Sequence, residues 1–318
     1  MRITASHFEG LMHVASDVAT PELMPSALLA VAQEGYSRAR FIDALVGGKD
    51  HYALDRELAG KVRRALPDGA DAAGRLFLED RRFQLRVCGM LLRRTPVTTF
   101  VLCGADQWSV DGDPLHDRIH RTRPDAAVIY AEPEPVIYSH ALGVYDTATT
   151  TRSSTVRVVQ ADIYDPGFLR ELQQPHGPIY PGEPVAVLHC ATLPFAPART
   201  GRTAADITAG LINTLPVGSF LALTHLCAPE EPDRAEAAYR AGEELAARGL
   251  GTRPFLPRKD IEALFDGLSL VVPNALTGSR VPVPCSEWYP PGPFRERFAI
   301  DQFNLAGFAC KGKPWPYA

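Results

Sequence analysis

The sequence VTTFVLCG (97–104) begins a series of apolar segments that decides the fold of this chain. Four more segments follow at intervals of roughly 30 residues: AAVIYAE (126–132), TVRVVQAD (155–162), PVAVLHCA (184–191) and GSFLALTH (218–225). Each is almost continuously apolar, which is typical of a strand covered on both faces. The intervals hold helix candidates such as AADITAGLINTL (204–215). Strands separated by such crossovers predict parallel βαβ units and an open, doubly wound α/β sheet.

The segments on either side of this series predict a division near residue 95. Residues 25–95 have a mainly helical pattern, and Gly47-Gly48 is placed to stop the first helix. We therefore expect a helical N-terminal domain, 1–95, followed by a sheet domain, 96–318. Within the second domain, LSLVV (268–272) and FNLAGFACKG (303–312) are candidates for a closing pair of strands. The proline-rich loop 273–293 is expected to be ordered, as a flap over the ligand edge or as a surface strap.

Composition excludes several classes of protein. The 318 residues are 46% hydrophobic and 22% charged, which is enough for a sizeable core without disulfides or metal. A net charge of −4 without long runs of one sign argues against a nucleic-acid partner. Six scattered cysteines, no signal peptide and no long apolar run predict a reduced, cytoplasmic protein that does not associate with membranes. The sequence has no convincing heptad pattern, so it does not indicate an oligomeric state.

Residues at the ends of the predicted strands indicate where a ligand binds. In an open parallel sheet, ligands lie outside the carboxyl ends of the strands, near the point where the strand order reverses. The first strand ends at Gly104, the second at Glu132 and the third at Asp162. Glu132 is placed to accept from ribose hydroxyls, and Asp162 from an exocyclic amine such as that of adenine. The alternative is that both acids only cap the following helices.

The turn after the first strand favours adenosine over a dinucleotide. Gly104 is followed by Ala-Asp-Gln-Trp, so the G-x-G-x-x-G pattern is absent. Asp106 would repel a phosphate, and no G-x-x-x-x-G-K-[ST] sequence is present. We therefore expect a nucleoside-like ligand without a diphosphate.

Several segments together resemble an actinobacterial family of S-adenosylmethionine-dependent methyltransferases. The most specific is DALVGGKDHYALDRE (43–57), because its L-x-G-G-K-D type of run is particular to that family. The other segments are VIYAEPEPVIYSHA (128–141), VQADIYDP (159–166), LPVGSFLALTH (215–225), IEALFDGLSLVVP (261–273) and NLAGFACKGKP (304–314). The resemblance spans about residues 25–314.

This resemblance implies a class I methyltransferase fold, a Rossmann-like, mostly parallel sheet of seven strands with an antiparallel last strand, and an N-terminal helical cap. It implies S-adenosylmethionine as the cofactor and a small-molecule substrate. In that family the G-G-K-D run helps to close the cofactor site, which here gives Gly47, Gly48, Lys49 and Asp50. Glu132 matches the acid that holds the ribose, and Asp162 matches the aspartate near the adenine.

The chain departs from the family at the methionine end of the site. The family's first strand ends D-I-G-T-G, whereas this chain has Leu102-Cys103-Gly104-Ala105-Asp106. Leu102 therefore replaces the acid that would meet the methionine ammonium. Asp106 replaces the second glycine, where backbone approaches the ligand closely. The adenosine half is better preserved than the methionine half.

Three functions remain open from the sequence. The first is methyl transfer to a small molecule in natural-product biosynthesis, with His189 or His225 as candidate catalytic bases at strand ends. The second is another reaction on the same scaffold, such as cyclisation or elimination. The third is a non-catalytic binding protein. Each histidine could instead be a hydrogen-bonded core residue. No pair has ligand spacing on a helix, so no metal site is predicted.

Overall fold

The fold is seen in a computed structural model, which describes residues 35–68, 72–105, 114–145, 156–273, 278, 280–289 and 297–312. The helices in these ranges are α3 (Arg38–Val46), α4 (Ala53–Ala65), α5 (Ala72–Arg94), α6 (Leu115–Thr122), α7 (Pro135–Tyr145), α8 (Phe168–Leu172), α9 (Ala204–Thr214), α10 (Pro232–Ala246) and α11 (Arg258–Ala263). The strands are β1 (Thr99–Cys103), β2 (Ala127–Glu132), β3 (Val156–Gln160), β4 (Val185–His189), β5 (Phe220–Ala228), β6 (Leu256–Pro257), β7 (Ser269–Leu270), β8 (Val283–Pro284) and β9 (Asn304–Cys310).

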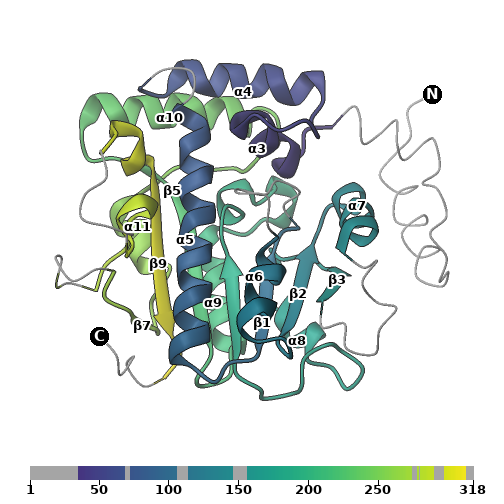
Figure 1. Cartoon of the computed structure of the whole chain (residues 1–318). Helices are drawn as coiled ribbons and strands as arrows, with labels where there is room; N and C mark the ends of the chain where they lie inside the picture. The colour runs from purple at the N-terminus through teal and green to yellow at the C-terminus, as the bar shows by residue number, and fades with distance from the viewer. Residues whose placement is uncertain are drawn as a thin grey trace. The chain divides into compact units, whose positions relative to one another are not determined.

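The sheet has the order β3-β2-β1-β4-β5-β9-β7, with β6 paired to β5 and β8 paired to β9 (Figure 1). Strands β1 to β5 are parallel, and β9 runs antiparallel to β5 and β7. The predicted fold class is therefore confirmed, including the antiparallel last strand. The five apolar segments of the sequence are β1 to β5, and the predicted closing pair is β7 and β9.

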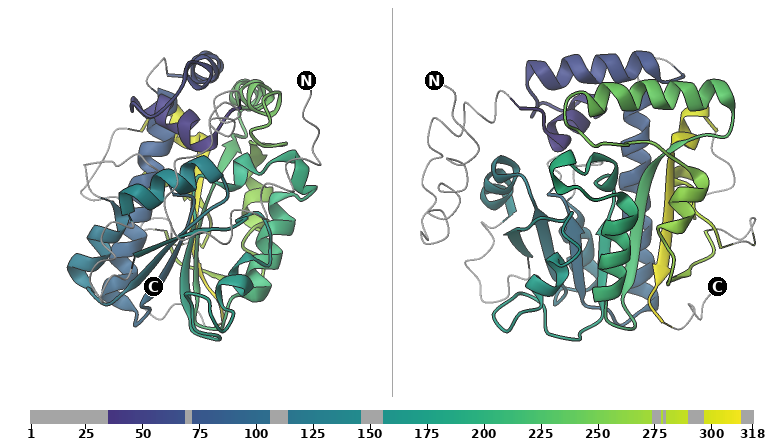
Figure 2. Two further views of the ribbon diagram at one scale, coloured as in Figure 1. Left: turned by 90° about the vertical axis from the view of Figure 1, so that its right-hand side faces the viewer. Right: turned by 180° about the vertical axis from the view of Figure 1, so that it is seen from behind.

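Helices cover both faces of the sheet, as the edge-on view in Figure 2 shows. Side chains of one alternate set, including Phe100, Val128 and Leu188, pack with residues of α5, α6 and α7. The other set, including Val101 and Val187, packs with residues of α8 and α9. Burial on both faces explains why these strands are almost continuously apolar in the sequence.

A third apolar cluster joins α3, α4, α5 and α10 at the carboxyl end of β5. It contains Phe41, Leu58, Phe77 and Leu226. The Phe41 and Phe77 rings meet edge to face, with centroids 6.4 Å apart. Helices α3 to α5 and the sheet belong to one compact unit, Tyr36–Ala318. This packing places the start of α3 over the carboxyl ends of the strands.

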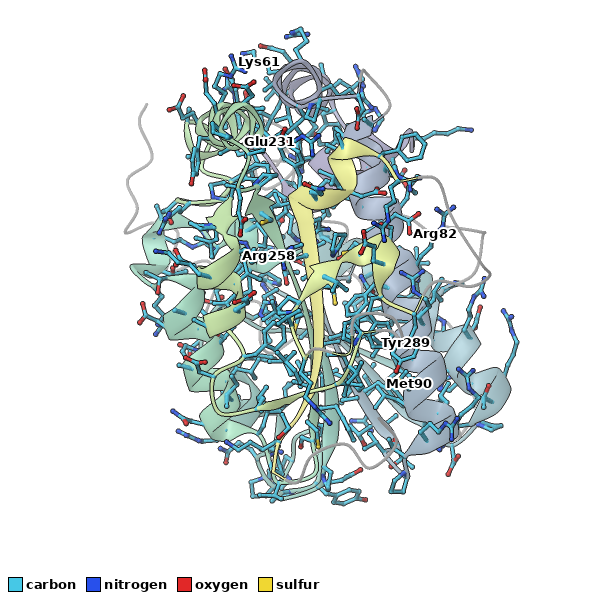
Figure 3. All side chains as sticks on the ribbon, turned by 90° about the vertical axis from the view of Figure 1, so that its left-hand side faces the viewer. Lys61, Arg82, Met90, Glu231, Arg258 and Tyr289 are labelled. Atoms are coloured by element: carbon cyan, nitrogen blue, oxygen red, sulfur yellow. The ribbon has the colours of Figure 1, made fainter. Side chains whose placement is uncertain are left out.

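The described part of the proline-rich loop is packed into the edge of the sheet. The buried Trp288 ring meets Phe83 of α5 edge to face, with centroids 5.1 Å apart, and it also contacts Phe308 of β9. Tyr289 packs against the same apolar cluster as Met90 of α5, and both residues are labelled in Figure 3. The Tyr289 backbone N–H donates to the Pro273 carbonyl at 2.8 Å. Residues 274–277, 279 and 290–293 of this loop lie outside the described ranges.

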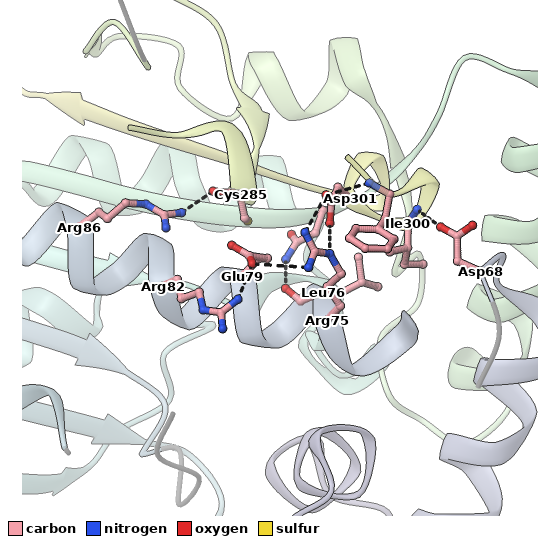
Figure 4. A network of polar contacts seen from close by, with 11 residues as sticks. Asp68, Arg75, Leu76, Glu79, Arg82, Arg86, Cys285, Ile300 and Asp301 are labelled. Atoms are coloured by element: carbon pink, nitrogen blue, oxygen red, sulfur yellow. Dashed lines mark hydrogen bonds and ion pairs between the residues drawn. The ribbon is translucent and has the colours of Figure 1, made fainter. Parts of the chain in front are cut away.

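Polar contacts join α5 to the C-terminal segment (Figure 4). Arg75 forms a bidentate pair with Asp301, with distances of 2.7 Å from Nε to Oδ1 and 3.1 Å from Nη2 to Oδ2. Arg86 Nη2 donates to the Cys285 carbonyl at 2.6 Å. These contacts hold the start of β9 and the loop before it against the helix.

Replacing Asp301 with alanine is expected to lower the free energy of unfolding by about 1–3 kcal/mol, because it removes a bidentate and largely buried pair. Chemical denaturation of Asp301→Ala measures this loss. Asp260→Ala, at an ion pair of 3.6 Å between more exposed side chains, is the control and should change stability by less than about 0.5 kcal/mol. Equal effects of the two changes would contradict the prediction.

Candidate functional site

The strand order reverses between β1 and β4. The chain runs from β1 outward through β2 to β3, and then returns to β4 on the other side of β1. In such sheets a crevice forms at the carboxyl ends of the two central strands. Gly104 follows β1, Glu132 ends β2, and Asp162 lies two residues beyond β3. The topology therefore brings these three predicted cofactor residues to one edge of the sheet.

Glu132 is fully buried at this edge. Its Oε2 accepts from the Ala105 backbone N–H at 2.8 Å, and its Oε1 accepts from the Glu134 backbone N–H at 2.8 Å. The carboxylate thus joins the turns that follow β1 and β2. Burial raises the pKa of Glu132 to about 7, and the Arg38 guanidinium opposes that shift. Glu132 is the last residue of β2, and its carboxylate is fixed in place by these two tertiary hydrogen bonds.

Gly104 has a φ of 90°, a conformation that L side chains rarely adopt. A Cβ atom at this position would lie 2.4 Å from Nη2 of Arg38 and 3.1 Å from its Cζ. The close approach that glycine permits is therefore made here by a guanidinium. Arg38 is the first residue of α3, and its Nη2 lies 3.7 Å from Glu132 Oε2. Its Nη1 donates to the Ala191 carbonyl at 3.3 Å.

Asp162 is exposed beside this cluster. Its Oδ1 accepts from the Tyr164 backbone N–H at 3.1 Å, a short-range contact that shapes the turn after β3. The Ala161 N–H donates to the Glu132 carbonyl, so the two strand ends lie side by side. The exposed side chain of Asp162 therefore lies at the same edge of the sheet as Glu132.

The G-G-K-D run lies at the other end of α3, where Asp43 organises it. Gly47 ends the helix with a φ of 81°. Asp43 Oδ2 accepts from the Asp50 N–H at 2.8 Å and lies 2.7 Å from His51 Nδ1. A Cβ at Gly48 would lie 1.8 Å from Asp43 Oδ1, so glycine is needed for this carboxylate to fold over the loop. Lys49 and Asp50 are exposed. The structure does not bring this run into contact with Gly104 or Glu132.

His189 and His225 are buried in the core. His189 Nε2 is 3.0 Å from the Ile163 carbonyl, and its Nδ1 contacts the Thr192 hydroxyl. His225 Nδ1 is 2.9 Å from the Leu226 carbonyl. Burial lowers the pKa of each histidine to about 4, which makes both poor proton acceptors near neutral pH. These contacts favour a structural role, and the catalytic assignment stays a prediction.

A buried polar network that no sequence motif indicates holds the turn after β4. Asp80 of α5 is fully buried, and its Oδ1 accepts from the Thr224 hydroxyl at 2.6 Å. Thr224 Oγ1 in turn accepts from the Ala191 N–H at 2.8 Å. Ala191 has a φ of 50°, which is unusual for a residue with a side chain. The network therefore fixes a strained turn whose carbonyl accepts from Arg38.

The signals for these residues in the sequence are weak. Asp80 lies on the same helical stripe as Gln84, Val87 and Leu91, and a carboxylate in an apolar stripe suggests a buried partner. Arg38 gives no such signal, since charged residues at the start of a helix are usually exposed. Only the tertiary structure reveals its place in the crevice.

A cavity of about 10 Å³ adjoins Gly104, enough for about one water molecule. It is lined by Arg81 and Gln84 of α5 together with Tyr130 of β2 and Cys190, the residue after β4. Among the described residues, no group of histidine, cysteine, aspartate or glutamate side chains is arranged to hold a metal ion. In the same part of the chain, no helix is long and apolar enough to cross a membrane.

Sequence comparison supplies the family. Residues 30–312 match the family model described as S-adenosyl methyltransferase, and this match covers most of the chain. The chain belongs to the S-adenosyl methyltransferase family. The family and the fold imply S-adenosylmethionine as the cofactor. No curated protein matches the sequence.

Two solved structures share the fold of this methyltransferase family member. A candidate methyltransferase from Thermobifida fusca YX is 23% identical, with a TM-score of 0.69 over 88% of this chain and 96% of its own. A DUF574 family protein from Streptomyces avermitilis MA-4680 is 24% identical, with a TM-score of 0.72 over 89% of this chain and 100% of its own.

The residues of the crevice fit one half of the cofactor. An acid at the end of β2 and a glycine with positive φ after β1 suit the adenosine half, because they offer ribose acceptors and close backbone approach. Leu102 is apolar and buried where an acid would meet the methionine ammonium. The Arg38 guanidinium occupies the space against Gly104. The guanidinium therefore lies against both residues that suit the adenosine half, Gly104 and Glu132.

Proposed function

We propose that this family member transfers a methyl group from S-adenosylmethionine to a small molecule in secondary metabolism. The observation that carries the proposal is the joining of Glu132, at the end of β2, to the turn after Gly104 by the Ala105 hydrogen bond. This places a carboxylate and a glycine with positive φ at the point where the strand order reverses. The bound cofactor would supply an already activated methyl group, so the protein's part is to align it with the acceptor.

The resemblance to the methyltransferase family also assigns roles to the two parts of the chain and to individual residues. We infer that the chain is a divergent member of its family, with residues 1–95 as a helical cap on a core of 96–318. Gly104, Glu132 and Asp162 are assigned to the adenosine half of the site. Gly47, Gly48, Lys49 and Asp50 are assigned to closure of the site by the cap, which requires this loop to approach the crevice. The substrate is assigned as a small molecule from the family as well.

A second function is favoured by one specific feature, the apolar Leu102 beside a crevice that Arg38 occupies. A scaffold that no longer transfers methyl groups has no need of an acid for the methionine ammonium. The second candidate is therefore a methyltransferase-fold protein with another reaction or a binding role.

Calorimetric titration separates the two functions. The wild-type protein is expected to bind S-adenosylmethionine and S-adenosylhomocysteine, and Glu132→Gln should weaken both by about tenfold or more, because a charged acceptor is lost. The matched control is Glu183→Gln, since Glu183 accepts from the Thr99 hydroxyl at 2.7 Å at the opposite end of the sheet. The affinity of Glu183→Gln for both ligands should equal that of the wild type. No heat from either ligand at millimolar concentration would rule out the methyltransferase function.

A further inference from the structure

Arg38 joins the ends of three strands from within the crevice. Its side chain is 3% exposed, and its guanidinium contacts the backbone region of Gly104, the carboxylate of Glu132 and the carbonyl of Ala191. Its own backbone N–H lies 3.3 Å from Glu134 Oε1. Glu132 is the acid to which the ribose is assigned. The same carboxylate and the same glycine face are therefore held by a side chain of α3.

The ion pair between Arg38 and Glu132 is longer than the ion pair that Arg40 of the same helix makes with Asp55. Arg38 lies 3.7 Å from Glu132 and 3.3 Å from the Ala191 carbonyl. Arg40, two residues later, pairs with Asp55 at 2.8 Å. Charge-assisted hydrogen bonds are strongest near 2.7–2.9 Å. The Arg38–Glu132 pair is therefore weaker than the Arg40–Asp55 pair.

A buried carboxylate needs a partner in the absence of a ligand. Removing Glu132 from water without compensation would cost several kcal/mol. Two backbone N–H groups and the nearby guanidinium supply this compensation. Ribose hydroxyls are also donors, so they can take over the role of the guanidinium at the same carboxylate. An exchange of donors would leave Glu132 compensated in both states.

We propose that Arg38 competes with the cofactor for the crevice, so that cofactor binding displaces its guanidinium from Gly104 and Glu132. This inference rests on the proposed function, because it takes the adenosyl ligand to bind at those two residues. Arg38 is then a positioning residue of the cap, which sets affinity by keeping the unliganded site closed. Since Arg38 is the first residue of α3, its displacement couples ligand binding to the start of that helix.

Arg38→Gln tests the competition by titration with S-adenosylhomocysteine and S-adenosylmethionine. The variant is expected to bind both ligands about tenfold more tightly than the wild type, which corresponds to about 1.4 kcal/mol. Arg38→Lys keeps the charge on a shorter side chain and should lie between the two. The matched control is Arg40→Gln, on the same helix as Arg38. This change breaks the buried pair of Arg40 with Asp55 of α4 and should leave the affinity for both ligands within about twofold of the wild type.

Thermal unfolding without ligand gives a second readout. Arg38→Gln is expected to lower the melting temperature while raising affinity, whereas a merely structural role would leave affinity equal or reduced.

The outcomes separate this inference from the proposed function. Wild-type binding with equal or weaker binding by Arg38→Gln would overturn the competition and leave the function standing. Weaker binding by both Arg38→Gln and Arg38→Lys would likewise overturn the competition, and it would show that Arg38 contacts the ligand. No binding by the wild type, Arg38→Gln or Arg38→Lys would overturn both the competition and the function.

Discussion

The free energy of unfolding is expected to fall as the pH is lowered from about 6.5 towards 4. Burial lowers the pKa of His189 and His225 from 6.5 to about 4, so between these values the unfolded chain binds protons that the folded protein does not. Each histidine then contributes stability that is present above pH 6.5 and is lost as the pH falls. The loss is on the order of 1.4 kcal/mol per pH unit for each residue, and on the order of 4 kcal/mol for both at pH 5.

Urea denaturation at pH 5, 6, 7 and 8 measures this effect. Glu132 acts in the opposite direction, because its raised pKa favours stability at low pH. The histidines are therefore isolated by comparing the wild type with His189→Gln/His225→Gln. The difference in pH dependence between the two proteins should be largest from pH 5 to 6.5 and should vanish above pH 7. Parallel profiles for both proteins would show that neither histidine titrates as its burial requires.

The second large effect is expected at Asp80. Asp80→Ala should lower the free energy of unfolding by about 3 kcal/mol, because it leaves the Thr224 hydroxyl and the Gln84 amide without their buried acceptor. Asp80→Asn keeps an oxygen acceptor and should cost less. The change also frees the Ala191 turn, since Thr224 holds that turn through the Ala191 N–H.

Chemical denaturation and calorimetry together check the Asp80 prediction. We expect a loss of stability in denaturation and a weakened response to S-adenosylhomocysteine in titration, because Ala191 lies at the crevice. Glu236→Ala is the control, as its side chain is 70% exposed on α10 and should change stability by less than about 0.5 kcal/mol. A loss at Asp80 no larger than that at Glu236 would mean that the network does not fix the turn.

The candidate site was predictable in part because strand ends meet by topology. Once β1 to β5 are recognised as parallel, the rule for ligand crevices brings Gly104, Glu132 and Asp162 to one edge without any knowledge of side-chain packing. The structure places all three there. The G-G-K-D run was assigned by resemblance alone, and the structure shows it as a surface loop held by Asp43. A local motif does not say which distant element it faces.

The role of Arg38 could not be predicted for a related reason. Its contact with Glu132 joins residues 94 positions apart, and nothing in the pattern around Arg38 differs from that of an exposed helix start. His189 illustrates the same limit of prediction from sequence. As a strand-end histidine it suggested catalysis, but burial in the folded protein, with partners at Ile163 and Thr192, lowers its pKa.

The strands and their parallel connections are predictable from the sequence alone, because near-continuous apolar runs at regular intervals require a sheet buried on both faces. The family is recognisable from segments such as DALVGGKDHYALDRE (43–57). The sequence also determined that an acid and a glycine would stand at the ends of β2 and β1. Tertiary structure alone decided what fills the space between them. Packing of α3 over the strand ends puts the Arg38 guanidinium against Gly104 and Glu132, a contact set by the fold and not by local pattern.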